Sequence, residues 1–85
     1  MLLGGVFLLD REEFIVVGNN DNSINIVKLE FNDDSFTIED LYNKIYNNKI
    51  MLHSCLLQKN NIYILDSFNN LLIKYDMSNN EYLEC

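Results

Sequence analysis

The sequence predicts an α+β fold that is mostly antiparallel β-sheet, in a single small domain spanning residues 1–85. Short apolar runs separated by polar turns occupy both ends of the chain, and one apolar stripe at helical spacing lies between them. A length of 85 residues suits one domain with one core. We therefore expect a β-meander at 2–31, a helical segment at 37–48 and a second β-meander at 50–84.

Strands are expected where β-branched and aromatic residues cluster. In the first meander these are residues 6–10, 14–17 and 23–31; in the second they are 51–57, 62–65, 71–76 and a short edge strand at 81–83. Residues 23–31 place Ile24 and Ile26 on one side and Val27, Leu29 and Phe31 on the other. This phase change indicates a bulge or a strand covered on both faces.

The middle segment has the features of an amphipathic helix at about 38–47. Thr37 and Asp40 suit a helix start, and Lys44 suits its last turn. The apolar stripe at i, i+3, i+4, i+7 and i+8 consists of Ile38, Leu41, Tyr42, Ile45 and Tyr46. The stripe predicts that this helix covers the sheet formed by the meanders, with Leu41 and Ile45 among the most buried residues.

The two meanders also match each other. Residues 14–17 align with 62–65 at an offset of 48, and residues 26–30 align with 72–76 at an offset of 46. In the second copy, the runs 61–65 and 74–82 resemble the second strand and the aromatic-ended tail of a kelch repeat, a similarity covering mainly residues 54–83. The double glycine of that repeat is reduced here to Gly18-Asn19 and Asp66-Ser67. The resemblance offers an alternative fold of two kelch-like propeller blades and implies a protein-binding scaffold that is completed by further blades.

A second resemblance covers the opening hairpin. Residues 5–18 look like the first hairpin of longin or roadblock domains, and a helix followed by three strands follows their order loosely. This resemblance implies a trafficking or signalling scaffold. The extra strand at 23–31 departs from the pattern.

The charge balance disfavours several kinds of partner. Asp and Glu total 13 against 6 Lys and Arg, which gives a net charge of −7. That sign disfavours nucleic-acid backbones and anionic membranes and suits a basic protein surface. The two cysteines, Cys55 and Cys85, make no disulfide framework, which favours an intracellular, cytoplasmic setting. The apolar residues 1–9 lack a basic flank and are too short to span a bilayer, so they are expected to form a buried strand.

Few residues suit chemistry. His53 and Cys55 would share one side of a strand, with Cys85 as a third ligand, but a zinc site needs four ligands at short spacings. A calcium loop starting at Asn19 would need glycine at Ile24. We therefore expect no metal, no cofactor and no catalytic set, with His53 and Cys55 as weak metal candidates.

Aromatic side chains are the better candidates for binding, because aromatic residues are enriched at the centres of protein interfaces. The candidates are Tyr42, Tyr46, Tyr63, Tyr75 and Tyr82. Together with the acidic charge they predict a small non-enzymatic interaction module. Such a module would dock on a larger assembly, with a basic surface such as that of a ribosome as one example. The alternative is a degenerate propeller or longin-like scaffold fragment that works in an oligomer.

Overall fold

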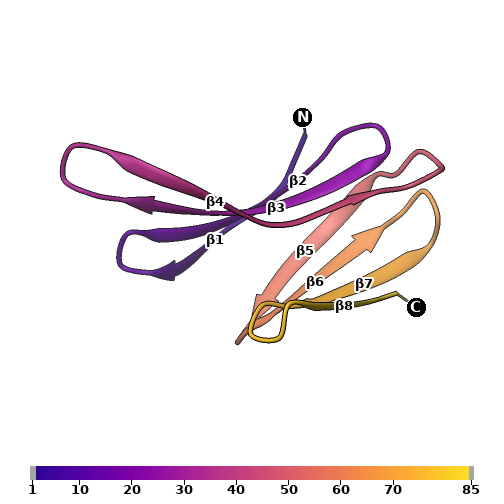
Figure 1. The fold of residues 1–85 in the computed structure, drawn as a ribbon. Coiled ribbons are helices and arrows are strands. Elements are labelled where there is room, and N and C mark those ends of the chain that lie inside the picture. Colours follow the sequence, from indigo (N-terminus) through magenta and orange to yellow (C-terminus); the bar gives the residue numbers. More distant parts are fainter. Residues whose placement is uncertain (1, 85) are drawn as a thin grey trace.

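The computed structural model describes residues 2–84, with side chains from Gly4 onward. These residues form two four-stranded antiparallel sheets, in which every strand pairs with its neighbour in sequence. The first sheet contains β1 (Leu2–Asp10), β2 (Glu13–Asn19), β3 (Ser23–Phe31) and β4 (Phe36–Ile45). The second contains β5 (Leu52–Gln58), β6 (Asn61–Asp66), β7 (Leu71–Asp76) and β8 (Glu81–Glu84). Figure 1 shows the two meanders as separate layers joined by the segment after β4.

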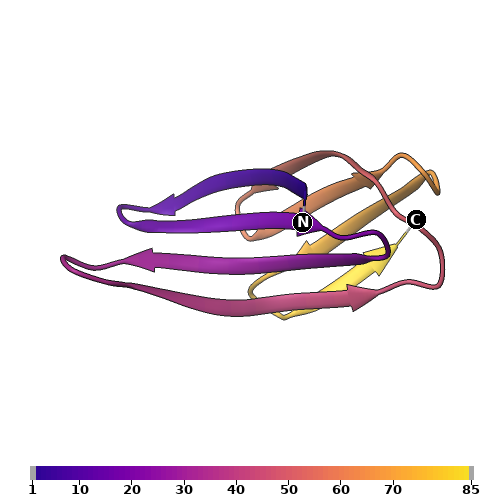
Figure 2. The same cartoon turned by 90° about the horizontal axis from the view of Figure 1, so that it is seen from above.

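The two sheets stack face to face. Seen from above, the second sheet overlies one half of the first sheet, and the ends of the β1–β2 and β3–β4 hairpins project beyond it (Figure 2). The shortest dimension of the molecule is 18 Å, which accommodates two sheets about 10 Å apart but no third layer. The sheets approach each other where β1 meets β5. A Cβ atom at Gly4 would lie 2.5 Å from Leu52 Cδ1, so the absence of a side chain at this position permits the close approach.

The core lies between the sheets and draws isoleucines from both. Ile15, Val17, Ile24 and Ile26 come from β2 and β3, and Ile62, Ile64, Ile73 and Tyr75 come from β6 and β7. Most of these side chains are fully buried. Phe7 and Leu57 pack against this cluster from β1 and β5. Alternation along each strand therefore directs one face of each sheet inward and leaves the other face outward.

The predicted α+β fold is wrong, because residues 2–84 contain strands only. The segment expected to be a helix at 38–47 is instead the ten-residue strand β4, paired along its length with β3. The expectation that Leu41 and Ile45 are among the most buried residues also fails. Ile45 is 70% exposed and Leu41 is only partly buried.

A β-bulge explains how this strand imitates a helix. The register of β4 against β3 shifts at Leu41, where Ile26 pairs with Tyr42 but Val27 pairs with Asp40. The extra residue reverses the alternation of inward and outward side chains along the strand. Apolar residues at helical spacing therefore lie on opposite faces of the sheet before and after the bulge. Pairing with β3 along the whole strand then outweighs the helix signals, as the surrounding structure commonly does.

The strands predicted on either side of this segment are found within a few residues of their expected ends. On β3, Ile24 and Ile26 face the core, while Val27, Leu29 and Phe31 face outward. The phase change therefore corresponds to a strand with apolar residues on both faces. The bulge in this pair of strands belongs to β4.

Two turns that connect consecutive strands of the second sheet have the same sequence pattern, Asp-x-x-Asn-Asn, at 66–70 and 76–80. In each turn the aspartate accepts a hydrogen bond of 3.0 Å from the backbone N–H two residues later. It also accepts one from the asparagine side chain three residues later, at 2.8 and 2.9 Å. The last asparagine takes a positive φ, 54° at Asn70 and 55° at Asn80, a conformation that asparagine tolerates better than most residues.

Asp66 has an additional role in this arrangement. Its buried carboxylate also accepts a hydrogen bond of 3.0 Å from Met51 N, and so ties the β6–β7 turn to the entry of β5. Burial alone would raise the pKa of this carboxyl, but hydrogen bonds from Asn69 and from the backbone outweigh it and lower the pKa. Asp66 is therefore a carboxylate whose charge is stabilised by its hydrogen-bond donors, and its hydrogen bonds stabilise the fold.

Candidate functional site: two open apolar sheet faces

Four of the five candidate tyrosines gather where the two sheets meet. The ring of Tyr42 on β4 lies 5.0 Å from that of Tyr75 and 5.2 Å from that of Tyr82, on β7 and β8. The Tyr75 hydroxyl lies 3.2 Å from the carbonyl oxygen of Leu41 and 2.5 Å from Asn80 Oδ1. Tyr75 is only 2% exposed, which leaves almost none of its surface for a partner.

The electrostatic properties of this tyrosine cluster are typical of side chains that pack between two sheets. Lys44 Nζ lies 4.9 Å from the ring centre of Tyr82 and 5.8 Å from that of Tyr46, within the range of a cation–π contact. Burial raises the pKa of Tyr42 and that of Tyr46, so both hydroxyls stay neutral at physiological pH. Neutral hydroxyls and one stacked lysine join the sheets, and they supply no activated nucleophile.

His53 lies at a register irregularity of β5, between Leu52 and Ser54, whereas Cys55 pairs with Ile64 in the regular part of the strand. His53 is exposed, whereas Cys55 is half-buried beneath Gly4 and Gly5 of β1. Burial raises the pKa of the Cys55 thiol to about 11, which leaves it protonated and weakly nucleophilic. Among the described side chains, no group of three His, Cys, Asp or Glu residues is placed to hold a metal. Cys85, the third suggested ligand, lies outside the described residues.

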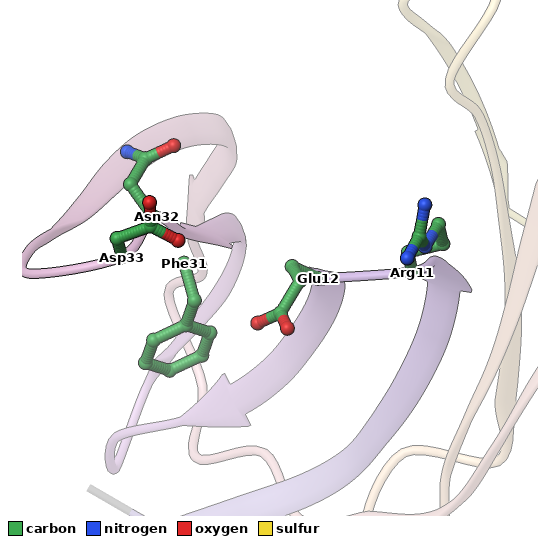
Figure 3. Close-up of a pocket in the computed structure, with 5 residues that line it drawn as sticks. All are labelled: Arg11, Glu12, Phe31, Asn32 and Asp33. Carbon is green, nitrogen blue, oxygen red and sulfur yellow. The ribbon is translucent and has the colours of Figure 1, made fainter.

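A polar hollow lies at the tips of two hairpins of the first sheet. It measures about 510 Å³ and is lined by Arg11, Glu12, Phe31, Asn32 and Asp33 (Figure 3). The figure shows Glu12 and Phe31 on facing sides, with Arg11 at the far end. All five residues are exposed to solvent. Charges in such an open site are screened by water, so the hollow offers no enclosed environment for catalysis.

The outward face of the first sheet, here named the first open face, is mostly apolar, with Asp40, Asn25 and Asn43 as polar residues on it. Strand pairing places residues from all four strands side by side on it: Val6, Leu8, Phe14, Val16, Val27, Leu29, Phe31, Phe36 and Ile38. Leu8 is 64% exposed and Ile38 is 59% exposed. Phe14 and Phe31 meet edge to face with ring centres 5.8 Å apart, and Phe31 lies 6.1 Å from Phe36. The face is therefore one contiguous apolar surface.

The outward face of the second sheet, the second open face, is also rich in apolar side chains. Strand pairing groups Leu56, Tyr63, Leu65, Leu72, Lys74 and Leu83 on it. Leu56 is 58% exposed and Leu83 is 64% exposed. Tyr63 lies near the middle of this face, so it is a candidate tyrosine on an open surface of the chain. Contiguous exposed apolar surface on both sides of a small protein is typical of interaction sites.

The sequence contained a signal for these faces. Residues 14–17 are apolar without alternation, and 23–31 carry apolar residues in both phases. Such runs indicate strands covered on both faces, whereas two stacked sheets cover only one face of each. The predicted helix would have covered the outward face of a sheet, so these apolar runs alone did not indicate that the outward faces stay open.

Comparison of the chain with protein-family models, with curated proteins and with solved structures gave no match. Within residues 2–84 no helix is long and apolar enough to cross a membrane. The chemistry and exposure of the two open faces therefore carry the functional argument.

Proposed function

We propose that the protein is a non-enzymatic protein–protein interaction module that joins a larger assembly through its two open apolar faces. The observation that carries this proposal is the first open face, where nine apolar side chains from four strands lie together and several are more than half exposed. Burying a leucine fully contributes about 1.5–3 kcal/mol, so a partner covering this face gains several such contributions.

Several acidic residues lie at the ends of the strands that form these faces, and Asp40 lies on the first open face itself. Asp10 ends β1 and Glu12 lies in the turn after it, Asp33 and Asp34 lie in the β3–β4 turn, and Glu81 starts β8. An apolar centre with a charged rim is the usual anatomy of a protein interface. The acidic rim suits a partner with basic residues around its own apolar patch, as a ribosomal protein surface can provide. Because rim charges act mainly on the rate of association, we expect added salt to lower the association rate constant by a larger factor than the affinity.

A propeller-type scaffold is the second candidate, and the strand arrangement favours it. Each meander has four antiparallel strands in sequential order, which is the composition of one propeller blade. The longin-like alternative depends on a helix after the first hairpin, and β4 occupies that segment. The kelch resemblance of residues 54–83 therefore remains a proposal that fits the sheets, with binding of other proteins as the implied role.

Co-purification from cells that make the protein tests the interaction module. Leu8→Asp alters the first open face and Leu56→Asp the second, while Asn47→Asp adds the same charge at an exposed position after β4. Loss of one buried leucine corresponds to about 10- to 100-fold in affinity. We expect partners to be depleted at least tenfold by a face variant and retained by Asn47→Asp. Identical recovery with all three variants would show that the open faces bind nothing.

A further inference from the structure

We propose that the first open face of one copy of this chain docks on the second open face of another copy, so that copies assemble head to tail. This inference rests on the proposed interaction module and names its partner. It follows from the faces that equivalent residues occupy in the two sheets.

The strand pairings define the equivalence of the two sheets. In the first sheet Phe14 pairs with Leu29, and in the second Ile62 pairs with Tyr75 at the same offsets as in the sequence match. Phe14 and Leu29 lie on the first open face, whereas Ile62 and Tyr75 are buried in the core. Residues with the same place in the meander therefore face outward in the first sheet and inward in the second.

The opposite face shows the reverse. Ile15 and Ile26 are buried in the core, and their equivalents Tyr63 and Leu72 lie on the second open face. The same exchange holds for a charged position, since Lys28 on the inward face corresponds to Lys74 on the outward one. The open face of each sheet is thus the counterpart of the face that the other sheet buries.

The interface inside the chain is consequently a template for one between chains. It joins the inward face of the first sheet to the inward face of the second. The second open face is equivalent to the inward face of the first sheet, and the first open face is equivalent to the inward face of the second sheet. The first open face of one copy and the second open face of another copy therefore complement each other. Apolar contacts must carry this pairing, because the second open face has Asp76 and Glu81 beside Lys74 and the first open face has Asp40.

An interface between two different faces is heterologous, and it generates either a closed ring or an open filament. Propellers close with about four to eight blades, so a closed ring would contain about two to four copies of this two-sheet chain. In a ring every open face is covered. The exposed leucines of a single copy would then occupy the kind of environment that Phe7 and Leu57 already have in the core.

Light scattering coupled to size exclusion, together with native mass spectrometry, tests the assembly on the purified chain. We expect the unmodified chain and Asn47→Asp to form one discrete oligomer. Leu8→Asp and Leu56→Asp should each be monomeric, because each lacks one of the two faces that a head-to-tail contact needs. Their dissociation constants should rise at least tenfold.

Mixing the two variants gives the decisive result. Leu8→Asp retains a normal second open face and Leu56→Asp a normal first one, so the mixture should form a one-to-one dimer that cannot grow. A like-to-like contact predicts that one variant alone still dimerises and that mixing adds nothing, which would overturn the proposal. Leu8→Ser and Leu56→Ser replace the aspartate variants if far-UV circular dichroism shows that either has lost its sheet structure.

The outcomes separate this inference from the function on which it rests. If the unmodified chain is monomeric while its co-purifying proteins still depend on Leu8 and Leu56, self-assembly is wrong and the interaction module stands. In that case the open faces bind other proteins or further segments of a longer chain. If the chain is monomeric and its co-purifying proteins ignore both substitutions, both proposals fail.

Discussion

Ile26 and Leu72 occupy equivalent positions in the two meanders but have different surroundings. Ile26 is fully buried between the sheets, whereas Leu72 lies on the second open face and is 45% exposed. Truncating each to alanine compares the same position in a covered and in an open sheet face. The comparison tests the assignment of faces on which both proposals depend.

The expected costs follow from burial. Ile26→Ala removes about three carbon groups at ~0.8 kcal/mol each, and the cavity left behind brings the loss to about 2–5 kcal/mol. Leu72 already exposes nearly half of its surface, so Leu72→Ala should cost on the order of 1 kcal/mol. A chain of this length is stable by about 4–13 kcal/mol, so Ile26→Ala can unfold it. In that case Ile26→Val, at about 0.5–1.5 kcal/mol, is compared with Leu72→Val, which should cost less because nearly half of the Leu72 side chain is exposed.

Equilibrium urea unfolding measures these losses, with far-UV circular dichroism and tyrosine fluorescence as independent probes. The measurement should use the lowest workable protein concentration, so that contacts between copies are absent. Equal losses at Ile26 and Leu72 under those conditions would refute the face assignment. If copies assemble, raising the protein concentration should increase the cost of Leu72→Ala and leave that of Ile26→Ala unchanged.

Four further predictions concern individual side chains and a metal. The lowered pKa of Asp66 means that its contribution to stability is present above about pH 4 and is lost as the pH falls through the folded-state pKa. Asp66→Asn should therefore lower the unfolding free energy by about 1.5–3 kcal/mol at neutral pH and flatten the acid side of the stability curve; an unchanged acid side would contradict this. Tyr75→Phe should cost about 0.5–1.5 kcal/mol for its hydroxyl hydrogen bond, whereas Tyr63→Phe should cost almost nothing in the same urea titration. With Cys85→Ser as background, Cys55 should react slowly with iodoacetamide at neutral pH and fast once unfolded, because burial raises its pKa to about 11. Added zinc should leave the thermal midpoint of that variant unchanged, and a clear upward shift would reinstate a metal site at His53 and Cys55.

The strands outside the middle segment could be predicted because they combine β-branched residues with turn chemistry. The turns at 66–70 and 76–80 show this well, since Asp and Asn residues there make the hydrogen bonds that such turns require. The repeat offset also predicted which residues hold equivalent places. It contained no information on which face becomes buried, because that depends on how two sheets stack.

The middle segment could not be predicted, because its alternation is broken at a single residue. Leu41 is the extra residue of the bulge, and it places Ile38 and Tyr42 on opposite faces although they are four residues apart. A period of two interrupted in this way looks like a period of 3.6. For the candidate site, the sequence identified the tyrosines but could not show that Tyr42, Tyr75 and Tyr82 contact one another within the chain.

The sequential pairing of all the strands has a consequence for how the chain folds. Within residues 2–84 each strand finds its partner across a short connection, so the closure of every hairpin involves only local segments. Local contacts form quickly, and each meander can complete its pairings without the other. Docking of β1 against β5 is the long-range step, and it buries the isoleucines of both sheets. Substitutions in the turns should therefore change the folding rate, while substitutions in the sheet–sheet core should mainly change the unfolding rate.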